Sequence, residues 1–192
     1  MGKSNFKVGF CISGKGRLFL AALKQSSTLG IMPAFVFLDE TASSELDSIC
    51  QEHNIPCVRC DSSGRAAFDQ LLTQKVLDAQ LDLLVLTFNK LVPEKIVTGM
   101  PRKVLNVHMS LLPAFPGFGA LQKAIETGVR IAGATIHEVT TGIDDGPIVA
   151  QCEVAVDPHD NVETLGWKIY QELEPLYLQV LASFASGPTA VK

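Results

Sequence analysis

The sequence predicts a three-layer α/β domain in which helices cover both faces of a doubly wound, mostly parallel sheet. Two features support this fold class. Apolar runs of strand length alternate with segments of helical periodicity along most of the chain, as in successive β-α-β units. The run Leu81–Phe88 is apolar at nearly every position, as expected for a central parallel strand with both faces buried. Such sheets bind ligands beyond the carboxyl ends of their strands.

The first unit comprises a strand at Phe6–Ile12, a glycine turn at Ser13–Arg17 and a helix that opens at Leu18–Leu23. This geometry suits phosphate binding, because free backbone N–H groups at a helix start face an anion. Further strands are expected at Pro33–Leu38, Ile55–Val58, Leu81–Phe88, Lys103–Ser110, Gly133–Thr140 and Ile148–Val156. Further helices are expected at Ser44–Glu52, Ser62–Leu77, Glu94–Met100, Ala120–Thr127 and from Asn161 onward.

Length and composition fit a single domain over residues 1–192, with 47% hydrophobic and 19% charged residues. A net charge of −4 provides no basic surface, which argues against a nucleic-acid partner. No apolar run approaches the length needed to span a membrane, so no membrane partner is expected. The segment Met1–Phe6 lacks the apolar core of a signal peptide, so we expect a cytoplasmic protein. The sequence leaves the oligomeric state open.

The chain has five cysteines, an odd number that favours free thiols in a protein without a secretion signal. Cys50, His53, Cys57 and Cys60 are spaced closely enough to suggest four zinc ligands. However, Cys50 and His53 end an expected helix, and residues three apart on a strand, such as Cys57 and Cys60, face opposite ways. The spacers are also shorter than those of ordinary zinc modules. We therefore expect free cysteines and no metal.

Polar residues alternate with apolar ones at the end of the strand that begins at Lys103. Alternation places Asn106, His108 and Ser110 on one face, where unpaired polar groups are costly to bury. One interpretation is that Asn106 and Ser110 cap the next element and that His108 is a paired core histidine. The later sequence Asp144-Asp145-Gly146-Pro147 offers the imidazole a carboxylate partner instead.

Three motifs in this order resemble a known family: Asn106–Pro113, Gly133–Thr140 and Asp144–Pro147. The chain is similar to the folate-dependent formyltransferases, and most closely to their glycinamide ribonucleotide transformylase branch. This resemblance implies a Rossmann-like formyltransferase fold. It also implies one-carbon transfer, in purine biosynthesis, from the co-substrate 10-formyltetrahydrofolate to a primary amine of a small molecule. The implied catalytic residues are Asn106, His108 and Asp144.

The resemblance implies a folate pocket lined by Phe88, Asn89, Lys90, Leu91, Val92, Thr140, Ile143 and Asp145. Within it, Lys90 stands where the family usually has an arginine and leaves a cation for the glutamate tail of the folate. The resemblance further implies an amine-substrate site formed by Gly14, Lys15, Gly16, Arg17, Arg65, Met109 and Glu172.

The amine-substrate site departs from the family pattern. The family usually has Gly-x-Gly-Ser-Asn in the phosphate loop, whereas this chain places Arg17 and Leu18 after the second glycine. Met109 replaces the usual proline. Arg17 can bind a phosphate or a carboxylate through its fork of N–H donors, or it is a solvated cation beside a tight turn. Arg65 and Glu172 likewise are either substrate ligands or solvated helix residues.

Formyl transfer passes through a tetrahedral intermediate with negative charge on the formyl oxygen, which requires hydrogen-bond donors. The Asn106 amide and the His108 imidazole supply donors, and Asp144 orients the imidazole and favours its charged form. Asp144 and His108 also move the proton from the attacking amine to the departing folate nitrogen. His137 shares a face with Thr135 and is either a support for these residues or an ordinary core residue.

Three other functions compete with formyl transfer. A formyltetrahydrofolate deformylase would use the same residues with water as acceptor, although deformylases normally carry an additional N-terminal regulatory domain. A serine hydrolase would use Ser110, His108 and Asp144, but Ser110 lacks the G-x-S-x-G elbow. A regulator that binds folate or nucleotide without turnover would not need Asn106, His108 and Asp144. The formyl acceptor itself stays open among glycinamide ribonucleotide, an amino sugar and an amino-acid derivative.

Overall fold

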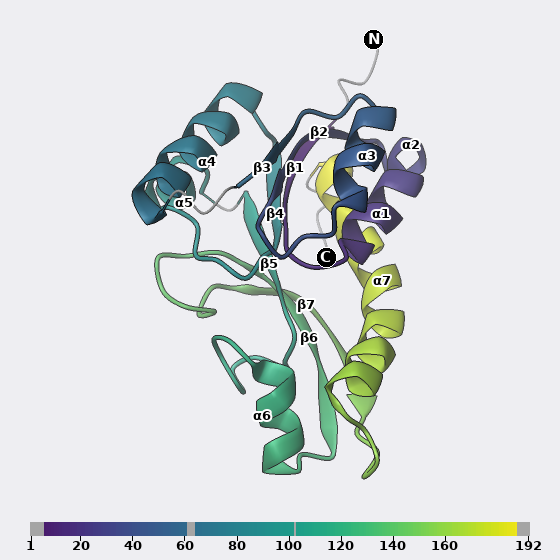
Figure 1. Cartoon of the computed structure of the whole chain (residues 1–192). Coiled ribbons are helices and arrows are strands. Elements are labelled where there is room, and N and C mark those ends of the chain that lie inside the picture. Colours follow the sequence, from purple (N-terminus) through teal and green to yellow (C-terminus); the bar gives the residue numbers. More distant parts are fainter. Residues whose placement is uncertain (1–5, 61–63, 102, 188–192) are drawn as a thin grey trace.

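The computed structural model describes residues 6–60, 64–101 and 103–187, and these build one seven-stranded sheet (Figure 1). Its strand order is β3-β2-β1-β4-β5-β6-β7. The five strands from β3 to β5 pair in parallel: β3 (Cys57–Arg59), β2 (Ile31–Leu38), β1 (Phe6–Ile12), β4 (Leu83–Thr87) and β5 (Val104–His108). The carboxyl ends of β1, β4 and β5 therefore meet at the same edge of the sheet.

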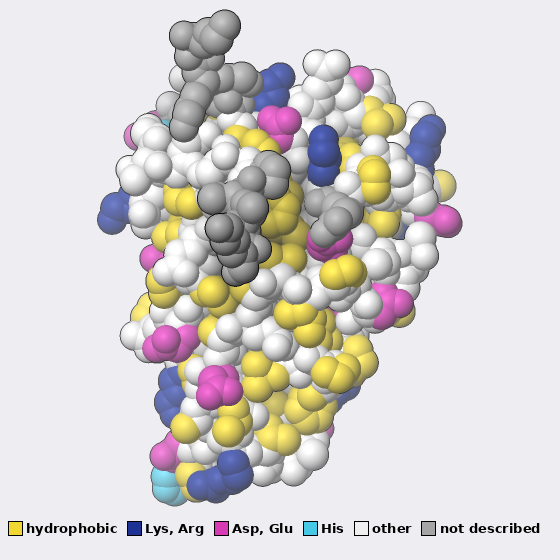
Figure 2. Space-filling view, turned by 180° about the vertical axis from the view of Figure 1, so that it is seen from behind, with side chains coloured by type: hydrophobic (Ala, Val, Ile, Leu, Met, Phe, Trp, Pro, Cys, Tyr) yellow, Lys and Arg dark blue, Asp and Glu magenta, His cyan; other side chains and the backbone are white. Residues whose placement is uncertain are grey.

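The last two strands, β6 (Ile131–Glu138) and β7 (Ile148–Ala155), run antiparallel to their neighbours. Their register places Asn106 opposite His137 and His108 opposite Thr135. The edge strand β7 has one face partly covered by the C-terminal helix and one face exposed. Figure 2 shows hydrophobic side chains gathered over the lower half of the molecule. On β6 and β7 themselves, Ile131, Ile148 and Val149 are exposed.

Helices cover both faces of the sheet (Figure 1). One core forms beneath α1 (Arg17–Lys24), α2 (Ser26–Leu29), α3 (Glu45–Glu52), α6 (Ala120–Thr127) and α7 (Val162–Ser186). A second core forms on the opposite face beneath α4 (Arg65–Ala79) and α5 (Glu94–Gly99). The structure thus confirms the three-layer, doubly wound and mostly parallel fold predicted from the sequence.

The bounds of most predicted elements agree with the structure to within a few residues. The third strand begins at Cys57 instead of Ile55, because the Ile55 N–H bonds to the Cys50 carbonyl and Pro56 has no N–H to offer. The single-turn helix α2 was not predicted, and it ends at Gly30, whose φ of 69° suits a residue without Cβ. The helix α7 is capped by Asn161, the residue before its first turn, whose side chain accepts hydrogen bonds from the Glu163 and Thr164 N–H groups.

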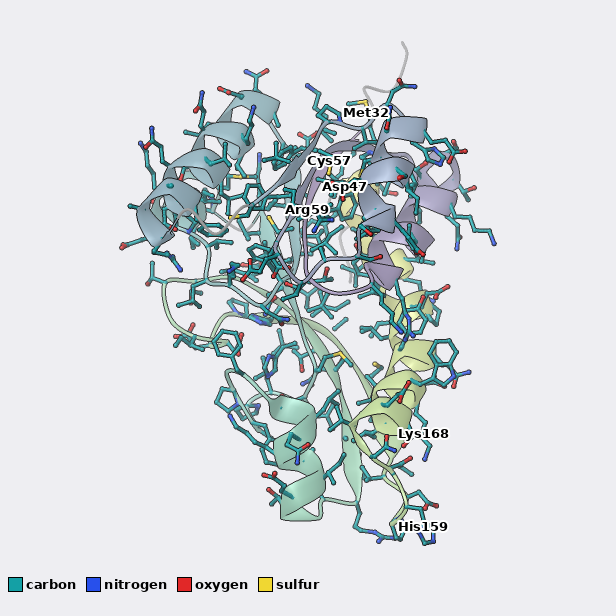
Figure 3. The ribbon with its side chains drawn as sticks, in the orientation of Figure 1. Met32, Asp47, Cys57, Arg59, His159 and Lys168 are labelled. Carbon is teal, nitrogen blue, oxygen red and sulfur yellow. The ribbon has the colours of Figure 1, made fainter. Side chains whose placement is uncertain are left out.

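The four residues considered as zinc ligands do not converge. Cys50 is buried in the core under α3, whereas Cys60 is buried in the core on the opposite face of the sheet. Between α3 and β3, Arg59 bonds to Asp47 and to the carbonyl oxygens of Asp39, Ala42 and Ser43 (Figure 3). His159 lies exposed at the far end of the molecule.

Within the ranges that the structure describes, no group of three or more histidine, cysteine or acidic side chains is placed to hold a metal ion. Within the same ranges, no helix is both long and apolar enough to cross a membrane.

Candidate active site

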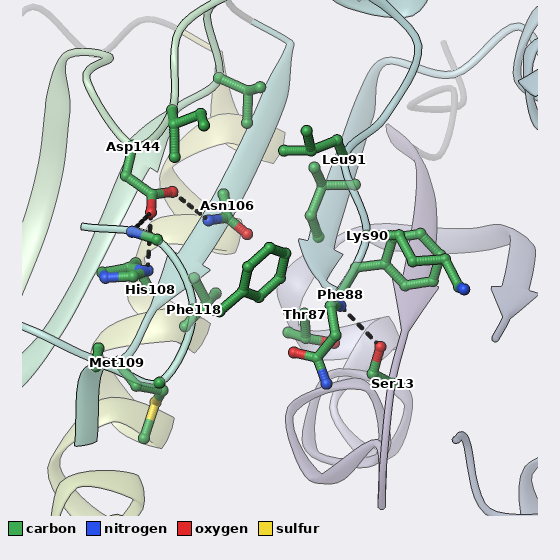
Figure 4. A pocket seen from close by; sticks show the side chains of 18 of the residues that line it. Ser13, Thr87, Phe88, Lys90, Leu91, Asn106, His108, Met109, Phe118 and Asp144 are labelled. Atoms are coloured by element: carbon green, nitrogen blue, oxygen red, sulfur yellow. Dashed lines mark hydrogen bonds and ion pairs between the residues drawn. The ribbon is translucent and has the colours of Figure 1, made fainter. Parts of the chain in front are cut away.

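The structure brings Asn106, His108 and Asp144 together (Figure 4). Asn106 and His108 lie at the carboxyl end of β5, and Asp144 lies in the loop between β6 and β7. The His108 Nδ1 atom is 3.3 Å from Asp144 Oδ2, and Asn106 Nδ2 donates to Asp144 Oδ1 at 3.3 Å. The His108 and Asp144 side chains are only 10% and 13% exposed, so water screens this pair weakly.

The carboxylate of Asp144 is held in place by a third donor, the Gly117 N–H, at 2.8 Å from Oδ2. Gly117 belongs to the loop that follows β5, so this bond joins the two loops that carry the site. Asp144 has a φ of 51°, in the left-handed region that aspartate tolerates better than bulky residues do. The carboxylate is therefore fixed by backbone geometry as well as by its side-chain partners.

His137 completes the cluster from β6. Its Nδ1 atom faces the Glu138 carbonyl at 2.9 Å and so carries a proton, which leaves Nε2 as an acceptor in the neutral ring. Asn106 Nδ2 lies 3.2 Å from this Nε2 atom. The two amide hydrogens of Asn106 thus point to Asp144 and to His137, and both bonds are long. His137 is buried and sets the orientation of the Asn106 amide.

Ser110 does not join Asn106 and His108, contrary to the prediction that the three would share a strand face. The strand β5 ends at His108, and the chain then turns, so that Ser110 Oγ donates to the Ala114 carbonyl at 2.6 Å. The other ring nitrogen of His108, Nε2, faces the Phe115 carbonyl at 2.9 Å. Neither ring nitrogen of His108 is directed at the Ser110 hydroxyl, so the serine-hydrolase interpretation has no geometric support.

Two residues that the sequence analysis did not assign hold the loop after β5. The hydroxyl of Thr135 donates to the Ser110 carbonyl at 2.7 Å and accepts from the Leu112 N–H at 3.0 Å. Gln151 Nε2 donates to Thr135 Oγ1 at 2.9 Å and to the Leu112 carbonyl at 3.0 Å. Thr135 lies within a predicted strand motif, but only the antiparallel register shows that it faces this loop.

A cavity of about 890 Å³ opens beside the cluster. Of the predicted folate-site residues, those that line it are Phe88, Asn89, Lys90, Leu91, Val92, Thr140 and Ile143. Leu91, Phe118 and Ile143 are large apolar residues with at least half of their surface exposed, and they form part of its wall. Asp145 does not line the cavity, and its carboxylate accepts a hydrogen bond from the Thr140 hydroxyl.

Lys90 is not the free cation that the sequence analysis predicted. Its Nζ atom lies 2.7 Å from the Glu40 carboxylate, and this hydrogen bond raises the pKa of Lys90. The same bond lowers the pKa of Glu40. The Lys90 and Glu40 side chains are 30% and 54% exposed, so water screens the pair, it costs little to break, and the lysine can exchange Glu40 for another carboxylate.

Behind the cavity, a buried carboxylate supports the carboxyl ends of β1 and β2. Asp39 accepts from the Ser13 hydroxyl at 2.5 Å and from the Thr41 N–H at 2.9 Å. The Ser13 oxygen in turn accepts from the Asn89 N–H at 2.9 Å. The sequence analysis did not identify this network, which fixes the turn that carries Asn89 and Lys90.

A second cavity of about 370 Å³ adjoins the first. Both cavities are lined by Ser13, Leu18, Thr87 and Val162, and the second also by Lys15, Gly16, Arg17, Glu163, Gly166 and Trp167. The Arg17 guanidinium carbon lies 4.9 Å from the centre of the Trp167 ring and 5.5 Å from that of Tyr170. Gly14 and Met109 line the first cavity. The contribution of α7 through Trp167 was not predicted.

Two predicted amine-substrate residues lie outside both cavities. Arg65 pairs with Asp69, one turn further along α4, at 2.8 Å, and its guanidinium lies 5.5 Å from the centre of the Phe68 ring. Glu172 is exposed on α7 and lines neither cavity. The structure thus agrees with the alternative that both are solvated helix residues.

A doubly wound sheet with an amide, an imidazole and a carboxylate clustered at its carboxyl edge suits an enzyme class that transfers small acyl groups without a serine nucleophile. Comparison with known proteins narrows this class. The family model described as formyl transferase matches residues 6–181, and the chain belongs to this family. The family and fold predicted from the sequence are thereby confirmed.

Among curated proteins, the chain is similar to phosphoribosylglycinamide formyltransferase of Bacillus subtilis (strain 168), with 36% identity over 119 residues. That alignment covers 62% of this chain and 61% of the relative, less than two thirds of its length. Among solved structures, glycinamide ribonucleotide transformylase 1 from Symbiobacterium toebii has a TM-score of 0.87 and 33% identity, with 97% of this chain and 91% of that chain covered. A formyltetrahydrofolate deformylase from Pseudomonas syringae has a TM-score of 0.85 and 25% identity, covering 95% of this chain and 62% of that chain.

Proposed function

We propose that this protein transfers a formyl group from 10-formyltetrahydrofolate to the primary amine of a small molecule. The observation that supports this proposal most strongly is the cluster of Asn106, His108 and Asp144 beside a large cavity with apolar walls. The family membership and the relatives named formyltransferases support it independently.

The first cavity suits a folate. Its volume of about 890 Å³ is within the range of small-molecule sites, and its apolar residues, among them Leu91, Val92 and Ile143, match a flat aromatic ring system. The polar groups of Asn106, His108 and Asp144 line the same cavity, where they would act on the formyl carbon. Lys90 lies at the wall and would exchange Glu40 for a carboxylate of the folate's glutamate tail.

In the proposed reaction, Asn106 and His108 stabilise the negative charge that develops on the formyl oxygen. The His108 Nδ1 atom faces Asp144 and its Nε2 atom faces the Phe115 carbonyl at 2.9 Å, so His108 would exchange this carbonyl for the formyl oxygen as the partner of an Nε2–H. The Asn106 amide now points to Asp144 and His137 through long bonds, which are weak enough for the formyl oxygen to compete for one N–H. Such donors act most strongly in a site that excludes water.

Asp144 moves the proton. The amine nitrogen forms a new bond to the formyl carbon as the bond from that carbon to the folate nitrogen breaks. The amine must lose one proton and the folate nitrogen must gain one. Asp144 would accept the proton from the amine and His108 would give one to the leaving nitrogen, and a proton passing from Asp144 to His108 across their 3.3 Å contact would restore both groups.

Glycinamide ribonucleotide is the first acceptor to test, because the Bacillus subtilis and Symbiobacterium toebii relatives are named for it. Its phosphate would lie in the second cavity, next to Gly16 and Arg17. An amino sugar or an amino-acid derivative is the alternative acceptor, since the loop lacks the hydroxyl and amide that the family usually places there. Hydrolysis is the alternative reaction, which the similarity to a deformylase keeps open.

The test is to follow tetrahydrofolate release by absorbance after mixing the purified protein with 10-formyltetrahydrofolate. Release is expected only when an amine is added, with glycinamide ribonucleotide tried first and a panel of amino sugars and amino acids next. Equal release in water alone would replace transfer by hydrolysis. Folate binding with no release under any condition would favour the non-catalytic regulator and refute the proposal.

A further inference from the structure

Three adjacent strand ends of the parallel sheet are joined by one chain of hydrogen bonds. Asp39 follows β2, Ser13 follows β1 and Asn89 lies in the turn after β4, and β1 lies between the other two strands in the sheet. The Ser13 hydroxyl donates to the Asp39 carboxylate at 2.5 Å and accepts from the Asn89 N–H at 2.9 Å (Figure 4). The position of the turn after β4 therefore depends on a carboxylate two strands away.

Asp39 is the only buried acidic residue in the parts of the chain that the structure describes, with 1% of its surface exposed. A buried carboxylate is costly unless hydrogen bonds compensate for the lost water. The second oxygen, Oδ1, accepts from the Thr41 N–H at 2.9 Å and from the Thr41 hydroxyl at 2.7 Å. The carboxylate is thus held by donors on both oxygens. Ser13, Thr41 and Asn89 line the first cavity, but Asp39 lines neither cavity.

The turn that depends on this carboxylate is the segment Asn89–Val92, all of which lines the first cavity. Among the described hydrogen bonds, the bond from the Asn89 N–H to Ser13 is the one that joins the backbone of this turn to another segment. A side-chain bond from Lys90 to Glu40 adds to it, but that bond is exposed and a ligand can replace it. The buried chain through Ser13 is therefore the lasting attachment.

We propose that Asp39 is a positioning residue for folate binding, which acts through Ser13 to hold the turn Asn89–Val92 in the place where it contacts the reduced folate. This inference rests on the proposed function. Asp39 lines neither cavity, so it acts through the turn and not by contact with the folate. A turn that is already in place loses less conformational freedom on binding, which raises affinity.

The first experiment measures folate binding without turnover. Calorimetry would follow the binding of 5-formyltetrahydrofolate, a reduced folate, to the wild type and to two Ser13 variants. Ser13→Ala breaks the chain of hydrogen bonds and should weaken binding by about 3- to 10-fold. Ser13→Thr keeps the hydroxyl and should recover most of the affinity. Equal affinity in the wild type and Ser13→Ala would overturn the proposal.

A double variant tests whether Asp39 acts through Ser13. Asp39→Ala alone should weaken folate binding by about 3- to 10-fold. In the Ser13→Ala background it should weaken binding by less than about 2-fold more, because the connection to the turn is already broken. Effects that multiply in the double variant would show that Asp39 influences the cavity by another route, which would contradict the proposal.

Asp82 provides the matched control. Its carboxylate accepts from the Lys7 N–H at 2.8 Å and so joins the beginnings of β1 and β4, at the opposite edge of the sheet. Asp82→Ala removes a carboxylate bond between the same two strands and should lower the stability of the protein without changing its affinity for folate. An equal loss of folate affinity in Asp82→Ala and Asp39→Ala would point to general loosening of the fold and refute the positioning role.

Kinetics separate this inference from the proposed reaction. Ser13→Ala should raise KM for 10-formyltetrahydrofolate by the factor found in calorimetry, while kcat and the KM for the acceptor stay the same. A lower kcat with unchanged KM for the folate would contradict the positioning role. A wild-type protein that binds no reduced folate would refute the proposed function itself. Formyl transfer by the wild type, with equal KM for the folate in Ser13→Ala, would refute the positioning role alone.

Discussion

The two ends of the connected cavities are built in opposite ways. At the reactive end, Asn106, His108, His137 and Asp144 are buried or nearly so, and each of these side chains has a polar partner. At the acceptor end, Lys15 and Arg17 are exposed, and their charges have no carboxylate partner among the described ion pairs. The reactive end is complete before any ligand arrives, whereas the acceptor end presents unused donors.

This difference in burial and pairing explains why the residues at the reactive end match the family motifs, whereas those at the acceptor end depart from them. A buried polar cluster tolerates few changes, because removing one partner leaves another unpaired at a cost of about 1–3 kcal/mol. An exposed loop loses little when its side chains change. Chemistry is therefore expected to be retained at the reactive end, while acceptor choice is free to vary with Arg17 and Trp167.

The largest effect is expected at the reactive end. Asn106→Ala and His108→Ala should each lower kcat by about 10²–10³-fold, because each removes a donor to the developing oxyanion. Ser110→Ala is the matched control, since its hydroxyl donates to a backbone carbonyl and takes no part in the reaction. The assay is tetrahydrofolate release by folded protein, checked by circular dichroism. Wild-type turnover in either alanine variant, or loss in Ser110→Ala alone, would refute this assignment.

A smaller effect is expected on stability. Thr135→Val keeps the shape of a fully buried side chain but leaves the Leu112 N–H and the Gln151 amide without their shared acceptor. We expect the free energy of unfolding to fall by about 1–3 kcal/mol in denaturant titrations. Thr98→Val, whose hydroxyl bonds to a backbone carbonyl on the exposed face of α5, should change it far less. Similar decreases in the free energy of unfolding of the two variants would show that the buried hydrogen bonds of Thr135 contribute no more than the exposed one of Thr98.

At the acceptor end, two arginines provide a comparison of kinetic effects. Arg17→Gln should raise KM for the acceptor by about 10-fold with kcat nearly unchanged, because the lost contact lies far from the reacting atoms. Arg65→Gln should change KM by less than about 2-fold, since that arginine is occupied by Asp69 outside both cavities. A larger rise of KM in Arg65→Gln than in Arg17→Gln would indicate that Arg65 contacts the phosphate, as the family resemblance implies, and that Arg17 does not.

The smallest effect concerns the pair at the folate cavity. The hydrogen bond from Lys90 lowers the pKa of Glu40, so the pair's contribution is present at neutral pH and is lost as the pH falls through that lowered value. Lys90→Gln should therefore raise the pKa of Glu40 toward its ordinary value, which a carboxyl NMR titration measures. Because the pair is exposed, the thermal midpoint at neutral pH should hardly move. An unchanged Glu40 titration would show that the pair does not form in solution.

The sequence predicts the reactive end better than the acceptor end for a physical reason. Asn106 and His108 are close in the chain, and the motif around Asp144 marks its partner, so local patterns are sufficient. The role of Trp167 depends on how α7 crosses the loop before α1, a contact between segments far apart in the chain. In the sequence, Trp167 is only one tryptophan on an expected helix. The sequence alone does not distinguish a ring that contacts Arg17 from a ring that faces solvent.

Register and pairing account for the other differences. Glu172 lies close in sequence to Tyr170, yet on a helix two residues apart point in different directions, so only Tyr170 meets Arg17. Ser110 was expected to share a face with His108, but the strand ends before it. Lys90 was expected to be free, because a sequence does not show that Glu40, which follows β2, approaches the turn after β4 across the intervening strand β1.

The most direct test of formyl transfer at this site is to follow the labelled carbon itself. The protein would be incubated with 10-formyltetrahydrofolate carrying ¹³C in the formyl group, together with an amine that supports tetrahydrofolate release, and the products would be observed by ¹³C NMR. Formyl transfer predicts that the label appears as an N-formyl amide of the amine, in the wild type and not in His108→Ala. Label recovered as formate at the same rate, with or without the amine, would contradict it.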